Sequence, residues 1–305
     1  MPTTPDVPIV AIIGPTASGK TGLSLDLAAR LGGEIVNTDA MQVYRGMDIG
    51  TAKLPPAQRR GIPHHLLDTL EVRDPATVAQ FQAWARDVVA ALRARGVPPV
   101  LVGGSALYVR AILDRFAFPG TDDAVRARWE AELAAVGPHA LHAVLTERDP
   151  AAAAAILPEN GRRIVRALEV GELTGASFTA SLPVLEYADP RTVQIGLRID
   201  RPTLDARIEA RVQQMIDDGL VAEVEHLLGR GLLEGRTASR AIGYREIAAH
   251  LAGELTLAQA QERIVIATRQ FARRQDAWWR KDPRIVWLDH DDPELLEHAL
   301  AAVPR

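Results

Sequence analysis

The chain of 305 residues contains no cysteine, and only three of its basic residues are lysines: Lys20, Lys53 and Lys281. The lack of cysteine excludes disulfides, thiolate catalysis and cysteine-ligated zinc, and it fits a cytoplasmic protein. No apolar run reaches the roughly 18 residues that a membrane span needs, and the first residues do not resemble a signal peptide. We therefore expect no membrane partner.

Aromatic residues make up only 5% of the chain, and the formal net charge is −4. Taken alone, that net charge argues against a nucleic-acid partner. The charge is segregated, however, because residues 261–284 hold seven basic and three acidic residues, and an acidic stretch follows at 289–297. A solvated helix face explains such a basic run as well as a nucleic-acid contact does, so both interpretations stay open.

One stretch of eight residues fits the phosphate-loop pattern G-x-x-x-x-G-K-[ST]. It consists of Gly14, Pro15, Thr16, Ala17, Ser18, Gly19, Lys20 and Thr21. The apolar run at 8–13 predicts a buried strand before it, and the leucines at 23–31 predict a helix after it. Such a loop aims backbone N–H groups and the positive end of a helix dipole at one point. We predict a site for a ligand with two or more phosphates, with Lys20 facing the phosphates and Mg²⁺ on the Thr21 hydroxyl.

Strands alternate with helices along much of the chain. Strands are predicted at 34–38, 99–102, 192–199 and 285–288, and helices at 77–95, 106–113 and from a capping box at Thr256 to about Asp282. This alternation predicts an α/β fold, a P-loop NTPase-like parallel sheet wrapped by helices. Helix follows helix from 121 to 173, so we predict a discontinuous core of residues 1–120 and 190–305 with an all-helical insertion at 121–189.

Candidate residues follow three strands of this sheet: the phosphate loop, Asp39, and Gly103-Gly104-Ser105. Ligands bind at the carboxyl ends of parallel strands, so we expect the three to converge. Asp39 and Ser105 are also explained as ordinary helix caps. No strand that ends in a Mg²⁺-anchoring aspartate follows the loop, which weakens an ATPase interpretation without excluding it.

Two further pairs have simpler explanations. Arg207 and Arg211 share a helix face, which spacing alone explains best as a solvated basic edge. His64 and His65 are adjacent, so in a strand their side chains point to opposite sides, and we favour a structural role for them over a metal site.

Beyond the phosphate loop, six segments in order resemble motifs of the tRNA dimethylallyltransferase family. They are residues 39–53, 63–68, 102–108, 163–170, 241–245 and 269–275. The resemblance covers roughly residues 8–290, and the segment after Asp39 is its most specific part. It implies transfer of a dimethylallyl group from dimethylallyl diphosphate to the exocyclic amine of the adenine 3′ of the anticodon, tRNA position 37. It also implies a monomer that binds the anticodon stem-loop, partly through the helical insertion.

The resemblance assigns roles to residues of this sequence. Asp39 would be the general base, and Ser105, a threonine elsewhere in the family, would lie near the reacting centre. The phosphate loop and Arg211 would hold the diphosphate, with Mg²⁺ on Thr21. Contacts to tRNA would come from Asp39, Ala40, Met41, Gln42, Ser105, Arg126, Arg162, Arg163, Ile164, Val165, Arg166, Arg240, Ala241, Ile242, Gly243, Tyr244 and Arg245. Ala40 and Arg162 stand where the family has serine and glutamine.

Two other classes of function remain as alternatives. A small-molecule kinase or other P-loop NTPase would turn over ATP and need no RNA. An RNA-binding module with a vestigial loop would leave the intact Lys20, Thr21 and Asp39 unexplained. The residues do not decide which tRNAs are modified, the order of binding, or whether a nucleoside triphosphate also enters the loop.

Overall fold

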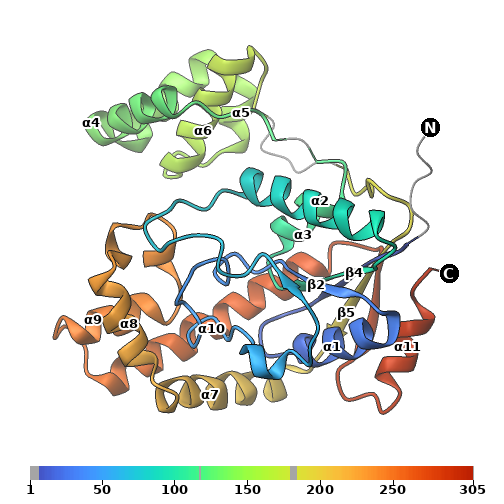
Figure 1. The fold of residues 1–305 in the computed structure, drawn as a ribbon. Coiled ribbons are helices and arrows are strands. Elements are labelled where there is room, and N and C mark those ends of the chain that lie inside the picture. Colours follow the sequence, from blue (N-terminus) through green and yellow to red (C-terminus); the bar gives the residue numbers. More distant parts are fainter. Residues whose placement is uncertain (1–6, 117, 179–183, 305) are drawn as a thin grey trace. The chain divides into compact units, whose positions relative to one another are not determined.

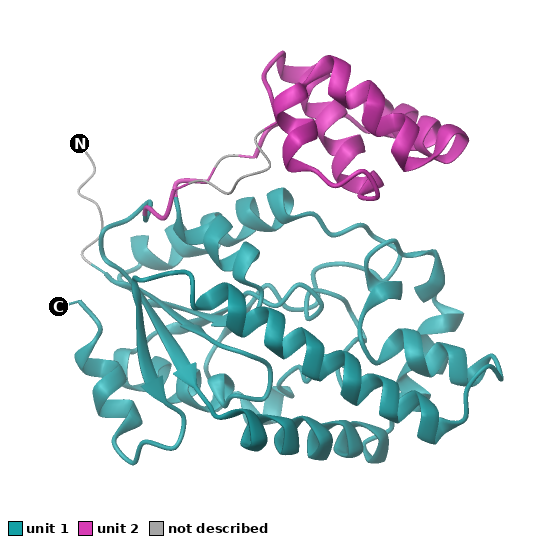
Figure 2. Ribbon diagram, turned by 180° about the vertical axis from the view of Figure 1, so that it is seen from behind, with its two compact units in different colours: residues 1–114, 187–305 teal, residues 115–186 magenta. Residues whose placement is uncertain are grey.

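The computed structural model describes residues 7–116, 118–178 and 184–304 (Figure 1). The chain divides into two compact units, which we call unit 1, residues 1–114 with 187–305, and unit 2, residues 115–186 (Figure 2). The sequence pattern suggests borders at 121 and 189. In the structure unit 1 extends to Asp114 and resumes at Tyr187. These two residues form an antiparallel bridge, which joins the two segments that connect the units and keeps both ends in unit 1. No described helix is both long and apolar enough to cross a membrane.

Unit 1 is built on a six-stranded sheet in which every strand pair is parallel, as predicted. The strands are β1 (Ile9–Ile13), β2 (Glu34–Asn37), β3 (His64–His65), β4 (Pro99–Gly103), β5 (Thr192–Arg198) and β6 (Ile285–Asp289), in the order β3-β2-β4-β1-β5-β6. Ile13 pairs with Gly103, and Asn37 pairs with Val102. The carboxyl ends of β1, β4 and β2 are therefore level and adjacent.

Helices cover both faces of this sheet (Figure 1). Those of unit 1 are α1 (Lys20–Leu31), α2 (Val78–Ala94), α3 (Ala106–Leu113), α7 (Arg201–Asp217), α8 (Leu220–Gly229), α9 (Tyr244–Leu251), α10 (Leu257–Trp279) and α11 (Leu295–Ala301). Alternate residues of β1 serve the two faces, as strand geometry requires. Ile13 packs in one core with residues of α2, α3, α7 and α10, whereas Ile12 packs in a second core with α1 and α11.

The long helix α10 begins where the sequence predicts and ends earlier. Thr256 Oγ1 accepts from Gln259 N at 3.2 Å, and Thr256 N donates to Gln259 Oε1 at 2.8 Å, which completes the predicted capping box. The helix ends at Trp279, so the expected end near Asp282 was wrong by about a turn. The buried Asp282 accepts instead from Gln194 and Arg284, which draws the chain towards β5 and β6.

The two histidines of β3 have structural partners. His65 Nε2 lies 2.6 Å from Glu34 Oε2 on the neighbouring strand, and His64 Nδ1 lies 2.8 Å from the carbonyl oxygen of Ile62. Burial lowers the pKa of His64, and the Glu34 carboxyl has a lowered pKa because His65 and Arg95 outweigh its desolvation. The pair therefore holds the edge strand in register.

Unit 2 is helical over its described residues and has its own core. It contains α4 (Asp123–Arg148), α5 (Pro150–Ala155) and α6 (Gly161–Thr174). Helix α4 is broken at Gly137, which has a φ of 79° and is followed by Pro138. Trp129, Leu141 and Ile164 belong to a core cluster separate from those of unit 1. Because this cluster closes within residues 115–186, unit 2 forms a compact body of its own.

Candidate active site

Three loops touch one another at the carboxyl ends of β1, β4 and β2. The backbone N–H of Thr38, after β2, donates to the carbonyl of Val102 at 2.9 Å. A Cβ atom placed on Gly103 would lie 2.2 Å from Thr38 Oγ1, and one on Gly104 would lie 3.3 Å from the carbonyl oxygen of Gly14. The close approach explains the two glycines, and it brings together the phosphate loop, Asp39 and Ser105.

The phosphate loop leads directly into α1. Gly19 is the N-cap of that helix in a left-handed conformation, with φ of 98°, which favours glycine. Lys20 Nζ donates to the carbonyl of Pro15 at 2.6 Å and so lies back across the loop. Ser18 Oγ is buried and has no partner among the described residues. The backbone N–H groups of Lys20 and Thr21, which have no partner among the described residues, lie at the start of α1 next to this unused hydroxyl, and the arrangement suits an anion.

The charges around this loop are mostly of one sign. Burial and, to a smaller extent, the nearby Arg211 lower the pKa of Lys20 to about 7, although the negative charge of Asp39 partly opposes them. Arg211 Nη1 donates to Thr16 Oγ1 at 3.4 Å, and burial together with Arg207 lowers its pKa. Arg211 is half-buried against the loop, whereas Arg207 is exposed. Of the two, only Arg207 therefore fits the solvated basic edge that their spacing predicts. An anion bound here would stabilise the charged forms of Lys20 and Arg211.

Asp39 is held in a defined turn at the end of β2. Its Oδ1 accepts from the backbone N–H of Met41 at 2.8 Å, and its own N–H donates to Asn37 Oδ1 at 2.9 Å. Burial raises the pKa of the Asp39 carboxyl, while the Met41 N–H and the Lys20 charge oppose that rise. The result is a half-buried carboxyl beside a cationic loop, an environment that strengthens it as a base.

Ser105 and Tyr108 face this region from α3. Ser105 is the N-cap of the helix, but its side chain makes no capping bond, so the hydroxyl is not used by the backbone. Tyr108 lies one turn further on, and its ring packs against Phe81 with centroids 4.8 Å apart. Burial, Tyr44 and Asp39 raise the pKa of Tyr108 to about 12, so this phenol stays protonated at neutral pH.

The segment after Asp39 is braced by two charged side chains, the buried Lys53 and the half-buried Glu223. The side chain of Lys53 is 3% exposed, and its Nζ lies 2.6 Å from carboxylates of both Asp48 and Asp68. Glu223 on α8 accepts from the backbone N–H groups of residues 48–50 at 2.7–3.2 Å. Gln42, predicted to contact tRNA, donates to the carbonyl of Thr51 at 3.0 Å. These bonds fix the position from which Ala40, Met41 and Gln42, all half-buried, face solvent.

Comparison with known proteins places the chain in a family. The family model described as IPP transferase matches residues 42–282, most of the chain. The chain belongs to the IPP transferase family. A tRNA dimethylallyltransferase of Nocardioides sp. is 72% identical over 99% of this chain and 97% of its own length, and one of Kineococcus radiotolerans is 59% identical over 98% of both.

Solved structures agree with this membership of the IPP transferase family. The tRNA isopentenylpyrophosphate transferase of Bacillus halodurans is 39% identical, with a TM-score of 0.70 over 96% of this chain and 95% of that one. A eukaryotic dimethylallyltransferase, captured acting on tRNA, is 25% identical, with a TM-score of 0.81 over 97% of this chain and 77% of that one. The predicted fold and family are confirmed.

The residues of unit 1 at 240–245 that the family resemblance assigns to tRNA binding fall into an exposed group and a buried group. Arg240 and Arg245 are exposed, and Ile242 is half-buried. Ala241, Gly243 and Tyr244 are buried, and the Tyr244 hydroxyl donates to Glu223 Oε1 at 2.6 Å. Only the two arginines therefore offer charged groups at the surface, while Tyr244 supports the loop behind Asp39.

The residues assigned to unit 2 divide in the same way. Arg162 and Arg163 are exposed at the start of α6, and no described residue pairs with their side chains. Ile164 and Val165 are buried in the core of the unit. The two remaining arginines, Arg126 and Arg166, both bond the fully buried Glu169 at 2.8 Å, and they hold its pKa below the usual range. Of these residues, Arg162 and Arg163 are the ones free to contact a ligand.

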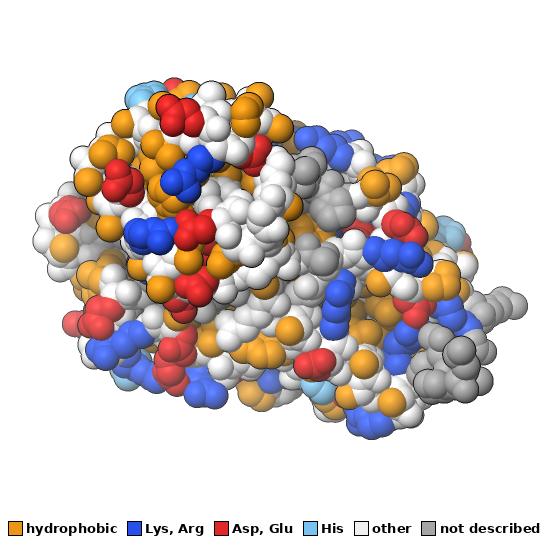
Figure 3. All heavy atoms as spheres, turned by 90° about the horizontal axis from the view of Figure 1, so that it is seen from above, with side chains coloured by type: hydrophobic (Ala, Val, Ile, Leu, Met, Phe, Trp, Pro, Cys, Tyr) orange, Lys and Arg blue, Asp and Glu red, His pale blue; other side chains and the backbone are white. Residues whose placement is uncertain are grey.

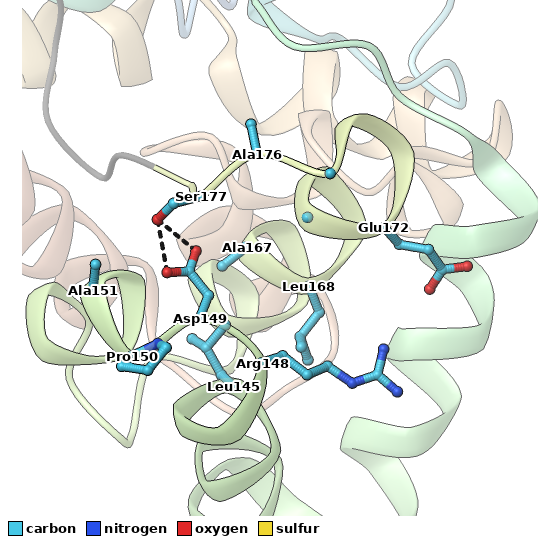
Figure 4. A pocket seen from close by; sticks show the side chains of 12 residues that line it. Leu145, Arg148, Asp149, Pro150, Ala151, Ala167, Leu168, Glu172, Ala176 and Ser177 are labelled. Carbon is cyan, nitrogen blue, oxygen red and sulfur yellow. Dashed lines mark hydrogen bonds between the residues drawn. The ribbon is translucent and has the colours of Figure 1, made fainter.

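Unit 2 also contains a pocket of about 520 Å³, and all of its lining residues belong to unit 2. Its lining comes from α4, α5, α6 and the segment after them (Figure 4). Ser177 Oγ donates to the Asp149 carboxylate, which also accepts from two backbone N–H groups, and Arg148 stacks over Trp129. The polar groups therefore have partners within the protein, which indicates a structural role. On the face drawn in Figure 3, acidic and basic side chains are intermixed.

Proposed function

We propose that the chain transfers a dimethylallyl group from dimethylallyl diphosphate to the exocyclic amine of adenine 37 in tRNA. The observation that carries the proposal is the half-buried carboxyl of Asp39 beside a loop whose cations, Lys20 and Arg211, are short of anionic partners. That arrangement suits a reaction in which a base takes a proton while an anion departs. The names of the highly identical relatives support the same activity.

The reaction assigns a task to each group. The adenine nitrogen forms a bond to the first carbon of the prenyl chain, and the bond between that carbon and the diphosphate oxygen breaks. The diphosphate leaves with the electron pair, and Lys20 and Arg211 stabilise its charge. The proton of the amine passes to the Asp39 carboxylate. Ser105 contributes a hydroxyl, unused by its helix, near the reacting groups.

The phosphate loop also fits Mg²⁺. The exposed Thr21 stands in the first turn of α1, and no described residue bonds its hydroxyl. Mg²⁺ prefers oxygen ligands and is commonly held by one or two protein oxygens together with phosphates and water, so one hydroxyl suffices. When bound, the ion would neutralise part of the diphosphate charge. Residues 14–20 and Arg211 would hold the rest.

For tRNA, we propose that the exposed arginines contact the anticodon stem-loop. Arg162 and Arg163 would do so from unit 2, and Arg240 and Arg245 from unit 1, each by contacts to phosphates or stacked bases. The target adenine must leave the base stack for its amine to reach Asp39. We expect a monomer acting in the cytoplasm.

The test uses labelled dimethylallyl diphosphate, Mg²⁺ and an anticodon stem-loop with adenine at position 37. The proposal expects label in this RNA and none in a matched stem-loop with guanine at that position. ATP with Mg²⁺ is incubated in parallel. An unlabelled RNA, together with steady ATP hydrolysis, would overturn the proposal in favour of an NTPase.

A further inference from the structure

A single side chain of α10 connects two of the three active-site loops. Gln275 Oε1 accepts from the backbone N–H of Thr16 in the phosphate loop at 2.9 Å. Its Nε2 donates to the carbonyl oxygen of Gly104, before Ser105, at 3.0 Å. The residue is only 6% exposed, so both bonds are sheltered from water. Gln275 thus uses both ends of its amide on backbone groups 259 and 171 residues away in the chain.

The backbone around Gly104 is shaped to admit this amide. A Cβ atom on Gly104 would lie 2.1 Å from Gln275 Nε2 and 3.1 Å from its Cδ, so any side chain there would displace the amide. Gly104 has no positive φ that would require glycine by itself. The close approach of Gln275, together with that of the Gly14 carbonyl oxygen, is therefore the local reason for glycine at this position.

We propose that Gln275 is a positioning residue that locks the diphosphate cradle to the loop carrying Ser105. The inference rests on the proposed prenyl transfer, because it assigns Gln275 to the alignment of that reaction. The cradle fixes the diphosphate end of the substrate, whereas Asp39 and Ser105 belong to the neighbouring loops. The distance between the leaving group and the attacking amine then depends on how firmly these loops are joined.

The lock predicts a separation of binding from chemistry. Lys20, Arg211 and the N–H groups at the start of α1 remain when Gln275 is changed, so affinity for the diphosphate should survive. The alignment of the diphosphate with the attacking amine should be lost, and a displacement of about 1 Å at a reacting centre costs on the order of a hundredfold in rate. We expect Gln275→Met, which keeps the length and loses both bonds, to lower kcat by about 10- to 100-fold and to change the Kd for dimethylallyl diphosphate less than about threefold.

A matched control lies on the same helix. Gln270 is exposed, and Gln270→Met makes the same chemical change without touching either loop. Its kcat and Kd should equal those of the unaltered protein. Full activity in the unaltered protein together with full kcat in Gln275→Met would overturn the inference and leave the proposed function standing. Equal losses in kcat and in diphosphate affinity would also overturn it, since they would show a binding role.

A second measurement does not depend on catalysis. Amide hydrogen exchange at Thr16 reports directly on the bond to Gln275, because Pro15 beside it has no N–H. Exchange at Thr16 should be slow in the unaltered protein and at least tenfold faster in Gln275→Met, with the rest of the sheet still protected. Unchanged protection at Thr16 would overturn the lock even if the variant were inactive.

Gly104→Ala supplies an independent route to the same broken contact. The added methyl should displace the Gln275 amide and lower kcat much as Gln275→Ala does. In Gly104→Ala with Gln275→Ala the clash with the amide is gone and only the milder 3.3 Å contact with the Gly14 carbonyl oxygen is left, so the double variant should be no slower than the slower single variant. Losses that multiply in the double variant would show that the two residues act separately and would overturn the inference.

Discussion

The hydroxyl of Tyr244 donates a hydrogen bond to Oε1 of Glu223 at 2.6 Å, inside the wall behind the active-site loop. The same carboxylate accepts the N–H groups of Asp48, Ile49 and Gly50. Tyr244 is 0% exposed, and burial next to the negative Glu223 raises its pKa strongly. Tyr244 therefore lies beneath the surface and braces the loop that carries Gln42.

Glu223→Gln should destabilise the protein and slow transfer. Hydrogen bonds to a charged acceptor contribute about 1.5–3 kcal/mol each, and the amide would present a donor to groups that are donors themselves. We expect the free energy of unfolding in urea to fall by about 2–3 kcal/mol. Tyr244→Phe removes one bond to the same charged acceptor and should cost about 1.5–3 kcal/mol. Glu225→Gln, exposed on the same helix, is the control; if it costs as much as Glu223→Gln, the brace has no special weight.

Local sequence determined much of what could be predicted. The loop at Gly14–Thr21, the strands beside it and the capping box at Thr256 depend on residues within a few positions of one another. The parallel order then follows from connectivity, which is why the sequence alone could place Asp39 and Ser105 beside the loop. The two-residue strand β3 and the helices α8, α9 and α11 are too short or too irregular in pattern to stand out.

The remaining parts of the site depend on contacts that no local pattern reports. Gln275 and Glu223 act on backbone groups more than 170 residues away, and nothing in their own neighbourhoods distinguishes them from other polar residues of a helix. The spacing of Arg207 and Arg211 shows that they share a helix face, but it does not show which of the two is buried by the rest of the protein. Spacing alone therefore predicts a solvated edge for Arg211 as well. Tyr244 and Ile164 lie within motifs, yet burial removes them from the surface.

Diphosphate affinity should depend on pH through Lys20. The pKa of Lys20 in the free protein is about 7, and a bound diphosphate favours the charged form, so binding takes up a proton above that pH. The affinity for diphosphate should therefore be highest below pH 7, and it should fall as the pH rises above 7, by at most tenfold per pH unit. Isothermal titration calorimetry in buffers of different ionisation enthalpy measures both the affinity and the proton uptake.

Two variants separate this effect from titration of the ligand itself. Lys20→Arg keeps a charge that does not titrate in this range, so it should bind without proton uptake by residue 20. Asp39→Asn removes the negative charge that supports the ammonium, so the decline should begin at a lower pH. If Lys20→Arg shows the same proton uptake as the unaltered protein, another group carries the pH dependence.

Asp39→Asn should abolish transfer while the substrate still binds. The amide oxygen can keep the bond from the Met41 N–H, so the loop should hold its shape, but no base remains. General-base catalysis contributes about 10²–10⁴-fold, and we expect single-turnover rates to fall by that factor. In the unaltered protein the rate should rise with pH as Asp39 loses its proton, at a pH above the ordinary range near 4, because burial raises its pKa. Near-normal turnover in Asp39→Asn would refute the assignment.

Removing Arg162 and Arg163 together should weaken tRNA binding in a salt-dependent way. Each arginine that neutralises a phosphate contributes about 0.7–0.9 to the slope of log K against log salt concentration, so the double alanine variant should lose about 1.4–1.8 from that slope. Arg166 belongs in a separate experiment, since its bonds to Glu169 and to the carbonyls of Pro119 and Gly120 make its loss a matter of folding as well. Arg128→Ala is the control for the loss of an arginine from the same unit, because its guanidinium already pairs with Glu172. An unchanged slope in the double variant, measured by filter binding with an anticodon stem-loop, would place the RNA surface elsewhere.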